Sequence, residues 1–348
     1  MKILIISDAW KPQINGVVRT YEFIGKELEN KGHTVKVIGP SDFPKRIPCP
    51  GYKEIELVIA PYKRLNAMIS AFAPDHIHIA TEGPLGKAAH KYCRLNNRHF
   101  TTSYHTHFPD YIAKRVAKFL PFLYNPVKNS AIKSLRKFHN QSNAMMIATQ
   151  SLEDELKSWG FTAPMHRLTR GADLEIFHTG EKTEFKDLPR PIAVFVGRVA
   201  IEKNIEAFLE MDWDGSKVVI GDGPDMAELQ QKYPQGHFIG KKLGKDLGDH
   251  IRSADVFAFP SRTDTFGMVL VEAMACGLPI AAYNVTGPKD IITENFLGTL
   301  DETDLSKAAY DALSKTGYEQ QRHAYVQQNY TWERAADQFI EIALNAEQ

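Results

Sequence analysis

The chain has 348 residues, of which 43% are hydrophobic and 24% charged, and its formal net charge at pH 7 is zero. This composition is typical of a globular protein and excludes a disordered chain, a fibrous protein and a small disulfide scaffold. The length suits two domains of about 150 to 200 residues each. The three cysteines are scattered along the chain, which fits a reducing compartment and matches no zinc motif.

We expect neither a signal peptide nor a membrane span from the sequence. Its first apolar run ends at Asp8, which is too early for the hydrophobic part of a signal peptide. The longest candidate span, residues 267–283, contains Glu272 and stops short of the ~18 apolar residues that cross a bilayer. We therefore expect a cytoplasmic protein.

The charges are distributed unevenly. Residues 1–170 carry a net charge of +12, and residues 171–348 carry −12. A strongly basic half indicates an anionic partner, such as a nucleic acid, a membrane surface or a phosphorylated substrate. Alternatively, the two halves attract each other across a cleft and close more readily at low salt. The two explanations are compatible.

The first forty residues follow a strand–helix–strand pattern. Residues 2–7 form an apolar run with the length of a buried strand, and apolar side chains then recur at helical spacing from Val17 to Leu28. Gly32 lies where a helix favours a left-handed residue at its end. The β-branched run at 34–38 completes a βαβ unit, which implies a parallel sheet. Further strands are predicted at 55–60, 76–80 and 100–104.

The alternation restarts in the second half, after a charged, proline-containing loop at 170–191 that is the predicted linker. The fold class is therefore α/β, with two Rossmann-like, doubly wound domains. We place these domains at residues 1–170 and 171–330, followed by a terminal segment at 331–348. Two such sheets facing each other would form a ligand cleft at the carboxyl ends of their strands. Strands of the second half are predicted at 192–196, 218–220, 237–239, 256–259 and 279–282.

The segment at 111–152 departs from this pattern because it contains no Asp or Glu. Its Lys and Arg residues alternate with aromatic and aliphatic ones, which is typical of a helix on an anionic membrane surface. The alternative is a solvated basic face above a packed helix. The side chains expected to contact a membrane are Lys114, Arg115, Lys118, Phe119, Phe122, Lys133, Arg136 and Lys137.

The densest functional signal lies at residues 260–290. A strand ends near Pro260, and a polar loop with the sequence SRTDTFG leads into a helix that starts near Gly267. The amides of the first helical turn, together with the helix dipole, form a site for a phosphate or for sugar hydroxyls. Asp264 and Glu272 would hold a sugar hydroxyl and a ribose. Alternatively, one is a capping acid and the other a helix-surface acid.

This segment resembles the acid–seven residues–acid signature of retaining glycosyltransferases of family four, which have the GT-B fold. The family usually has Glu at the first position, whereas this chain has Asp264, whose side chain is one methylene shorter. The resemblance implies that Glu272 binds the donor ribose. It also implies that Asp264 and the amides of Phe266 and Gly267 bind the hydroxyls of the donor sugar.

Other segments resemble the same family in the same order. FVGRVAIEKN resembles its G-R-x(4)-K stretch, so Arg198 and Lys203 would hold the donor diphosphate. An Arg fork and a Lys point charge suit that group, although two surface cations would look the same in the sequence. VIGDGP resembles the turn beside the nucleotide. KPQINGVVR resembles the first loop, where the amide of Gly16 would touch the phosphate. TSYHTHF would place His105 beside the reacting sugar.

Two segments resemble the family's connections between domains. RGADLEIF resembles its linker motif, with Arg170 in place of Asn, and YTWERAADQF resembles a terminal helix that crosses back to the first domain. By the resemblance, His105, Arg198, Lys203 and Asp264 are catalytic, and the donor is bound by Gly16, Gly197, Asp222, Gly223, Phe266, Gly267, Met268, Val269 and Glu272.

Within the family, NGVVRT, HIATEGPLG, TSYHTHFPDY and SRTDTFG resemble the subgroup that glycosylates membrane lipids. This implies a bacterial enzyme, peripheral on the inner face of the cytoplasmic membrane, that moves a hexose from a nucleotide sugar to diacylglycerol or a glycolipid. A UDP-sugar is favoured over a GDP-sugar. No cofactor or divalent metal is expected, because cations and helix termini would hold the diphosphate. The residues expected near the acceptor are Asn15, Arg19, Thr81 and Glu82, and Glu82 is also the candidate nucleophile for a covalent route.

Several alternatives remain at this stage. They are a GDP-mannose-dependent mannosyltransferase acting on a glycolipid, a transferase acting on soluble oligosaccharides or polysaccharides, and a nucleotide-sugar-binding protein without catalysis. The pair Asp212 and Asp214 is interpreted as part of a turn. The paired histidines lack the further ligands that zinc needs. Neither a nucleic-acid-recognition motif nor a G-x-G-x-x-G after the first strand is present, and the sequence does not predict the oligomeric state.

Overall fold

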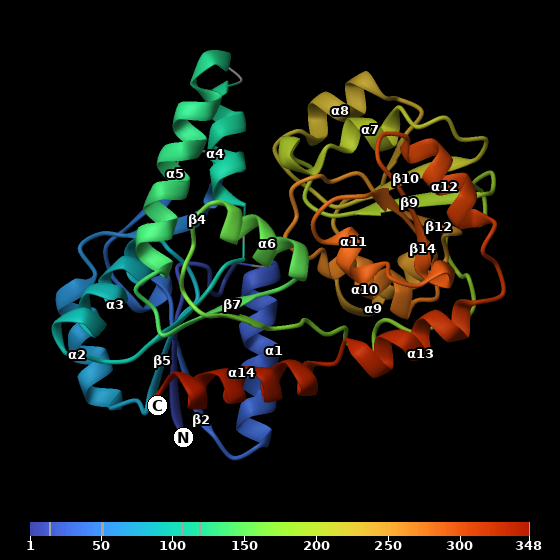
Figure 1. Cartoon of the computed structure of the whole chain (residues 1–348). Coiled ribbons are helices and arrows are strands. Elements are labelled where there is room, and N and C mark those ends of the chain that lie inside the picture. Colours follow the sequence, from blue (N-terminus) through green and yellow to red (C-terminus); the bar gives the residue numbers. More distant parts are fainter. Residues whose placement is uncertain (14, 50–51, 106, 118–119, 348) are drawn as a thin grey trace. The chain divides into compact units, whose positions relative to one another are not determined.

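The computed structural model describes the chain except residues 14, 50–51, 106, 118–119 and 348, together with the side chains of residues 52–55. The chain divides into two compact units (Figure 1). Unit 1 comprises Met1–Arg170 and Trp332–Gln348, and unit 2 comprises Gly171–Thr331. Unit 1 is therefore built from two separate stretches of sequence.

The central sheet of unit 1 is parallel throughout and has the strand order β2-β1-β5-β6-β7-β8. The chain moves from β1 to β2 on one side and later to β5 on the other. The loops after β1 and β5 therefore flank the point where the strand order reverses, which is where doubly wound sheets bind ligands. The strands are β1 (Lys2–Ile6), β2 (Thr34–Ile38), β5 (His76–Ile79), β6 (Thr101–Ser103), β7 (Ala144–Ile147) and β8 (Met165–Arg167).

Helices cover this sheet, and the first of them shows how the sequence sets their ends. The side chain of Asn15 accepts hydrogen bonds from the amides of Val17 and Val18, at 3.0 and 3.1 Å, and so caps α1. Gly32, with a φ of 84°, follows α1 as predicted. The helices of unit 1 are α1 (Gly16–Asn30), α2 (Tyr62–Phe72), α3 (Pro84–Leu95), α4 (Phe108–Ala117), α5 (Tyr124–His139), α6 (Gln150–Ser158) and α14 (Trp332–Ala346), with 3-10 turns at Pro40–Asp42 and Pro121–Leu123.

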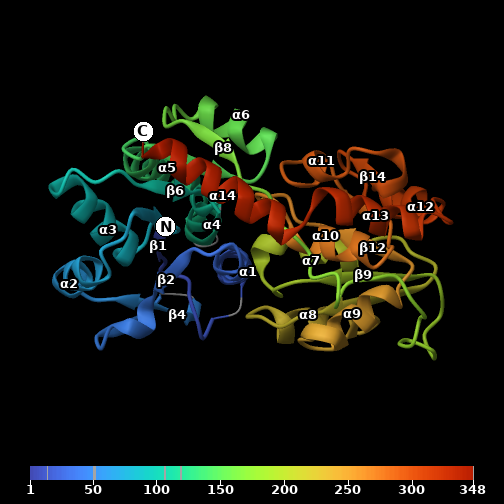
Figure 2. The same cartoon turned by 90° about the horizontal axis from the view of Figure 1, so that it is seen from below.

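Helix α14 packs across α1 (Figures 1 and 2). The rings of Phe23 and Trp332 stack with their centroids 4.9 Å apart. Lys31 at the end of α1 forms a 2.8 Å ion pair with Asp337. The last helix of the chain is thus part of unit 1.

The strand predicted at 55–60 differs from the structure. Strand β4 (Tyr52–Val58) pairs in the antiparallel sense with β3 (Arg46–Cys49), and the two form a separate hairpin outside the parallel sheet. Only residues 50–51 separate these strands. A connection of that length permits antiparallel pairing only, because parallel strands need a crossover of about a dozen residues or more. The strands at Ala144–Ile147, Met165–Arg167 and Gly298–Asp301 were not predicted either.

Helices α4 and α5 form a hairpin that extends away from the sheet of unit 1 (Figure 1). Its base is fixed by the carboxylate of Asp110, which accepts hydrogen bonds from the Tyr124 hydroxyl at 2.7 Å and from Lys128 at 2.9 Å. Burial opposes the ionisation of Asp110, but these bonds and one from His107 outweigh it and lower the pKa of the carboxyl group. The hairpin is therefore anchored by an ionised, buried carboxylate.

Unit 2 repeats the architecture, with a parallel sheet in the order β11-β10-β9-β12-β13-β14. Here the order reverses between β9 and β12. The strands are β9 (Ile192–Val196), β10 (Ser216–Ile220), β11 (His237–Phe238), β12 (Val256–Phe259), β13 (Ile280–Tyr283) and β14 (Gly298–Asp301). The helices are α7 (Ile205–Leu209), α8 (Met226–Lys232), α9 (Gly244–Arg252), α10 (Met268–Ala275), α11 (Pro288–Ile291), α12 (Leu305–Leu313) and α13 (Glu319–Asn329), with 3-10 turns at Ile201–Lys203 and Asn295–Leu297.

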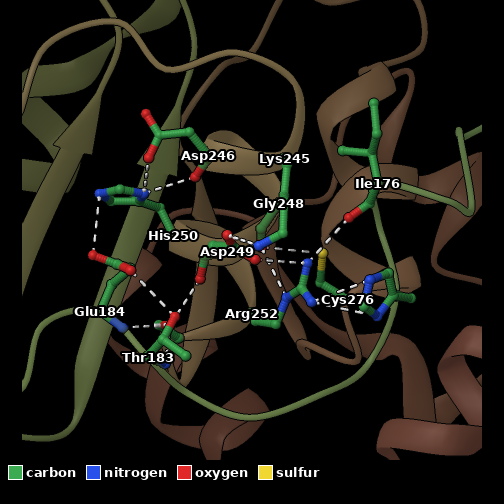
Figure 3. Close-up of polar contacts among 12 residues, drawn as sticks. Ile176, Thr183, Glu184, Lys245, Asp246, Gly248, Asp249, His250, Arg252 and Cys276 are labelled. Atoms are coloured by element: carbon green, nitrogen blue, oxygen red, sulfur yellow. Dashed lines mark hydrogen bonds and ion pairs between the residues drawn. The ribbon is translucent and has the colours of Figure 1, made fainter.

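Much of the predicted linker is bound to α9 (Figure 3). The buried guanidinium of Arg252 donates to the carbonyl of Ile176 at 3.2 Å and pairs with Asp249 at 3.2 Å. The hydroxyl of Ser253 accepts hydrogen bonds from the amides of Thr183 and Glu184, each at 3.0 Å. The segment from Ile176 to Glu184 is consequently an integral part of unit 2.

A chain of buried polar side chains crosses the interior of unit 1. His76 and His78 on β5 are both fully buried, and each lies within 2.9 Å of the hydroxyl of Thr101 on β6. At one end, His76 contacts Glu347 at 2.8 Å. At the other, His78 contacts the hydroxyl of Tyr21 on α1 at 2.7 Å. Burial lowers the pKa of His78 well below its ordinary value, so this imidazole is neutral in the folded protein.

We predict that this burial makes the stability of unit 1 fall in acid. In the unfolded chain His78 takes up a proton near pH 6.5, whereas the folded protein excludes that proton. The contribution of His78 to the free energy of unfolding is therefore complete above about pH 6.5. It is lost as the pH falls below that value, by up to about 1.4 kcal/mol per pH unit. Urea unfolding of the wild type and of His78→Gln tests this, because the stability difference between them should shrink between about pH 8 and pH 5.5. The exposed His166→Gln variant is the control. A pH-independent difference for His78→Gln would contradict the prediction.

Candidate active site

Four loops of unit 2 follow the carboxyl ends of neighbouring strands and meet at one edge of the sheet. They follow β10, β9, β12 and β13, which are consecutive neighbours in the sheet in that order. The loops after β9, β10 and β12, together with the first residues of α10 (Met268–Ala275), contain all of the residues predicted to bind the donor in this half of the chain. Those residues are Gly197, Arg198, Lys203, Asp222, Gly223, Asp264, Phe266, Gly267, Met268, Val269 and Glu272.

The loops after β9 and β10 lie in direct backbone contact. The amide of Val199 donates to the carbonyl of Asp222 at 3.0 Å. A Cβ atom on Gly221 would lie 1.8 Å from the carbonyl oxygen of Gly197, and one on Gly223 would lie 2.2 Å from that of Val199. Only glycine fits at these two positions, which explains the Gly-x-Gly spacing physically.

An ion pair joins the loops after β9 and β12. The ammonium group of Lys203 lies 2.6 Å from a carboxylate oxygen of Asp264, and both side chains are largely buried. The side chain of Asn204 adds a hydrogen bond to the carbonyl of Pro260 at 3.0 Å. Arg198 lies on the same loop as Lys203, directly after β9, and is half-buried. A positive and a negative group are therefore held side by side where the two strands end.

Helix α10 begins at this edge with Gly267 at its N-cap position. Gly267 has a φ of 90°, which favours glycine, and as a residue without a side chain it makes no capping bond to α10. Since the first amides of a helix lack intrahelical partners, those near Met268 and Val269 can serve an anionic or hydroxyl-bearing ligand. Glu272, one turn further on, is only 3% exposed.

Burial overturns one half of the alternative interpretation of the two acids. Glu272 is not a helix-surface acid, because it is buried. Phe266, between them in the sequence, is also buried and packs edge-on against Tyr330, with ring centroids 6.0 Å apart.

In unit 1, His105 follows β6 and both of its ring nitrogens have protein partners. Nδ1 lies 2.9 Å from the guanidinium of Arg170, and Nε2 lies 2.7 Å from the hydroxyl of Tyr21. Burial, and then the charge of Arg170, lower the pKa of His105 well below its ordinary value. Arg170 is itself buried and donates to the carbonyls of Leu168 and Thr169.

The remaining predicted residues of unit 1 lie in the loops after β1 and β5. Gly16 is exposed as the first residue of α1, Asn15 caps that helix, and Arg19 lies one turn into it. Thr81 exchanges hydrogen bonds with Asp8, at 2.7 and 3.0 Å. These residues surround the point where the strand order of unit 1 reverses.

Glu82 is held inside unit 1. Its carboxylate lies 3.0 Å from Nε2 of the buried His139, and its side chain is 9% exposed. The partner is on α5, far from Glu82 in the sequence.

Asp8 was not predicted as a functional residue, yet it organises this region. Its carboxylate accepts hydrogen bonds from the amides of Leu85 at 2.8 Å and Gly86 at 3.2 Å, at the start of α3. Burial is the main cause of its raised pKa. The only signal in the sequence was the abrupt end of the first apolar run.

The predicted membrane residues fall into three groups. Phe122 at the tip of the α4–α5 hairpin is 74% exposed, and Lys133 and Lys137 are exposed on α5. Lys114 and Arg115 are half-buried on α4, whereas Arg136 donates to the carbonyl of Trp159 at 3.1 Å and so contributes to packing. Lys118 and Phe119 lie outside the described residues. Exposed apolar side chains not predicted as contacts are Phe108, Ile112 and Leu120.

The described residues also bear on a metal site, on membrane spans and on the segment at 212–214. In the described parts of the chain, no three His, Cys, Asp or Glu side chains are grouped as a metal site would require. Every helix in the described parts is too short or too polar to cross a bilayer. The amides of Asp212 and Asp214 donate to the hydroxyls of Ser306 and Tyr310, and both residues lie in the connection between α7 and β10.

Comparisons with known proteins agree with this geometry. The family model described as Glycosyltransferase Family 4 matches residues 14–176, and that described as Glycosyl transferases group 1 matches residues 179–332. The chain is 27% identical to a GDP-mannose-dependent alpha-mannosyltransferase of Mycobacterium tuberculosis, covering 93% of this chain and 90% of that protein. It is 29% identical to the alpha-monoglucosyldiacylglycerol synthase of Acholeplasma laidlawii, covering 80% of this chain and 79% of the synthase.

Solved structures share the fold over almost the whole length. Sucrose-phosphate synthase from Thermosynechococcus elongatus superposes with a TM-score of 0.77 at 19% identity, covering 98% of this chain and 97% of that one. Anabaena HepE in complex with UDP-glucose gives a TM-score of 0.70 at 14% identity, covering 98% of both chains. With two Rossmann-like units and both family models matched in order, the chain belongs to the family-four glycosyltransferases, enzymes of the GT-B fold.

Proposed function

We propose that this glycosyltransferase moves a hexosyl group from a nucleotide sugar, preferably a UDP-sugar, to a membrane lipid such as diacylglycerol, with retention at the anomeric carbon. The observation that best supports a nucleotide-sugar donor is the ion pair of Lys203 with Asp264 beside the start of α10, where Gly267 has no side chain to cap the helix. A diphosphate leaving group needs positive charge and amides, and a hexose needs a carboxylate for its hydroxyls.

The roles follow from this arrangement. Arg198 and Lys203 stabilise the negative charge that develops on the diphosphate as its bond to the sugar breaks. Asp264, with the amides of Phe266 and Gly267, holds the sugar hydroxyls, and the buried Glu272 holds the ribose. Unit 1 supplies Gly16 and His105 to the same reaction. A divalent metal is not required in this proposal, because protein cations and a helix terminus supply its electrostatic function.

The lipid acceptor is supported by the α4–α5 hairpin. Its tip exposes Leu120 and Phe122, and Lys133 and Lys137 are exposed on α5. Apolar side chains beside cations suit the boundary of an anionic membrane. The matched synthase of Acholeplasma laidlawii carries glucosyldiacylglycerol in its name, which points to the same class of acceptor. The proposed location is therefore peripheral on the membrane, on its cytoplasmic face.

The main alternative donor is GDP-mannose, because a matched relative is named as dependent on it. UDP-glucose is bound in one of the superposed structures. The test is turnover across a panel of UDP- and GDP-sugars, with and without diacylglycerol in mixed micelles. Transfer that requires lipid and one UDP-sugar is the expected result. Transfer from GDP-mannose would overturn the donor assignment, and transfer only to soluble acceptors would overturn the lipid assignment.

We predict that Lys203→Ala lowers kcat/KM by about 100-fold or more, because one donor to the developing charge is lost. Asp264→Asn should lower kcat/KM as well, by weakening the hold on the sugar. The matched control is Lys232→Ala, which removes a lysine from an exposed ion pair with Glu206 in the same unit. Steady-state kinetics and circular dichroism of each variant check this. Loss of less than about tenfold in Lys203→Ala, with the fold intact, would contradict its role.

We predict that Lys133→Glu with Lys137→Glu weakens binding to anionic liposomes while leaving nucleotide-sugar binding unchanged. Arg136 is left intact because it holds Trp159. The control pair, Lys26→Glu with Lys87→Glu, makes the same change in net charge on exposed sites of α1 and α3. Phe122→Ser should separately lower the partition coefficient by about tenfold, since an exposed apolar ring is lost from the lipid boundary. Equal liposome binding by all of these proteins in a sedimentation assay would make the hairpin a packing feature instead.

A further inference from the structure

A continuous hydrogen-bonded path runs through unit 1 from a buried cation to a carboxylate. It begins at Arg170, passes through His105 to Tyr21, and continues along the buried side chains of β5 and β6 to Glu347. Each step is between 2.7 and 2.9 Å. The polarity of this path can be derived because its two end groups have fixed hydrogen-bonding roles.

Arg170, at the cationic end of the path, fixes the tautomer of a neutral His105. An arginine only donates, so Nδ1 of His105 is an acceptor and carries no proton. The neutral ring then carries its proton on Nε2 and donates it to Tyr21. Tyr21 in turn donates towards Nε2 of His78, either directly at 2.7 Å or through Ser103, which lies 2.8 Å from Tyr21 and 3.1 Å from His78.

Glu347, at the anionic end of the path, fixes the donors and acceptors independently of Arg170. A carboxylate only accepts, so a neutral His76 donates from Nδ1 to Glu347 and accepts at Nε2. The hydroxyl of Thr101 supplies that hydrogen and must itself accept one from Nδ1 of His78. His78 is therefore protonated on Nδ1 and accepts at Nε2, which is the tautomer that the cationic end also requires. The two ends enforce the same direction.

The surroundings reinforce this state. Burial lowers the pKa of Arg170 only to about 10, so it remains a cation at neutral pH. Phe339 of α14 packs edge-on against His78 and keeps water from the path. The titratable groups around His105 are Tyr21 of α1, His78 of β5, Arg170 after β8 and His139 of α5, which is paired with Glu82.

We propose that Arg170 and Glu347 are positioning residues that act through this path to hold His105 as a neutral imidazole, with Nε2 as its only donor, throughout the working pH range. The inference rests on the proposed placement of His105 beside the reacting sugar. It excludes His105 from proton transfer, because Nδ1 accepts from a cation and the proton on Nε2 is donated to Tyr21, and it leaves the fixed ring as part of the wall beside the sugar. It also gives Arg170, which replaces the asparagine usual in the family, a role in orienting His105.

The first test needs no turnover. Two-bond nitrogen–proton NMR of protein labelled with ¹⁵N-histidine reports the tautomer of each ring, and the His105 signal is identified by its loss in His105→Gln. We expect the Nε2-protonated tautomer, unchanged between about pH 5.5 and pH 8. In Arg170→Gln the same ring should titrate, because Nδ1 becomes available. An Nδ1-protonated ring in the wild type, or wild-type behaviour in Arg170→Gln, would overturn the proposal.

The second test follows activity against pH. Arg170→Gln should acquire an acidic limb in kcat, with a loss of about tenfold or more at about pH 5.5, and Arg170→Lys should restore part of it. Glu347→Gln should perturb His76 and His78 in the NMR spectrum and lower kcat less. Controls are Arg167→Gln and Glu341→Gln, which remove an arginine on β8 and an exposed acid on α14.

The outcomes separate the two levels of the proposal. If the NMR result holds but Arg170→Gln keeps the wild-type pH profile, His105 is not beside the reacting sugar, and the positioning role fails together with that assignment. If Lys203→Ala and Asp264→Asn retain activity while the NMR result holds, the donor site is wrong but the polarised path stands. Should Arg170→Gln fail to fold, the wild-type tautomer of His105 and the changes at His76 and His78 in Glu347→Gln still test the proposal.

Discussion

Parallel pairing in both sheets is the constraint on which the candidate site depends. Because every strand of each sheet points the same way, the loops that follow the strands emerge at one edge. In unit 2 this brings Lys203 and Asp264 within 2.6 Å, although they are far apart in the sequence. It also places two glycine-dependent turns in backbone contact. The site is thus a consequence of sheet topology, and its chemistry is supplied by a small number of side chains in the loops.

Unit 1 uses the same topology differently. Its interior contains a polar path in which each hydrogen bond has a partner of the opposite role. A buried polar group is costly when it is unsatisfied and rigid when it is fully satisfied. The path spans α1, β5, β6 and α14, so the position of His105 is coupled to the packing of elements from both ends of the sequence. This coupling explains how a loop residue can have a defined ring orientation.

Many elements of the fold, and the glycines at their ends, could be predicted from short stretches of sequence. Gly32, Gly267 and the Gly-x-Gly turn at 221–223 were recognisable because each position requires a backbone that other residues resist. The apolar periodicity of α1 and the short runs of the parallel strands were equally local signals. The hairpin of β3 and β4 was missed because a single apolar run does not reveal its pairing partner. Arg170, Asp8 and Glu347 were missed as functional residues because their roles arise from contacts with distant segments.

The division of the chain has a consequence for synthesis on the ribosome. Unit 2 is continuous in sequence, but unit 1 needs α14, which stacks Trp332 on Phe23 and brings Glu347 to His76. Domains fold as their segments emerge during translation. The first 170 residues therefore leave the ribosome with one flank of α1 uncovered, and they remain so until the second unit has been made. A nascent chain of this protein therefore keeps that flank of α1, which includes Phe23, uncovered until Trp332 has emerged.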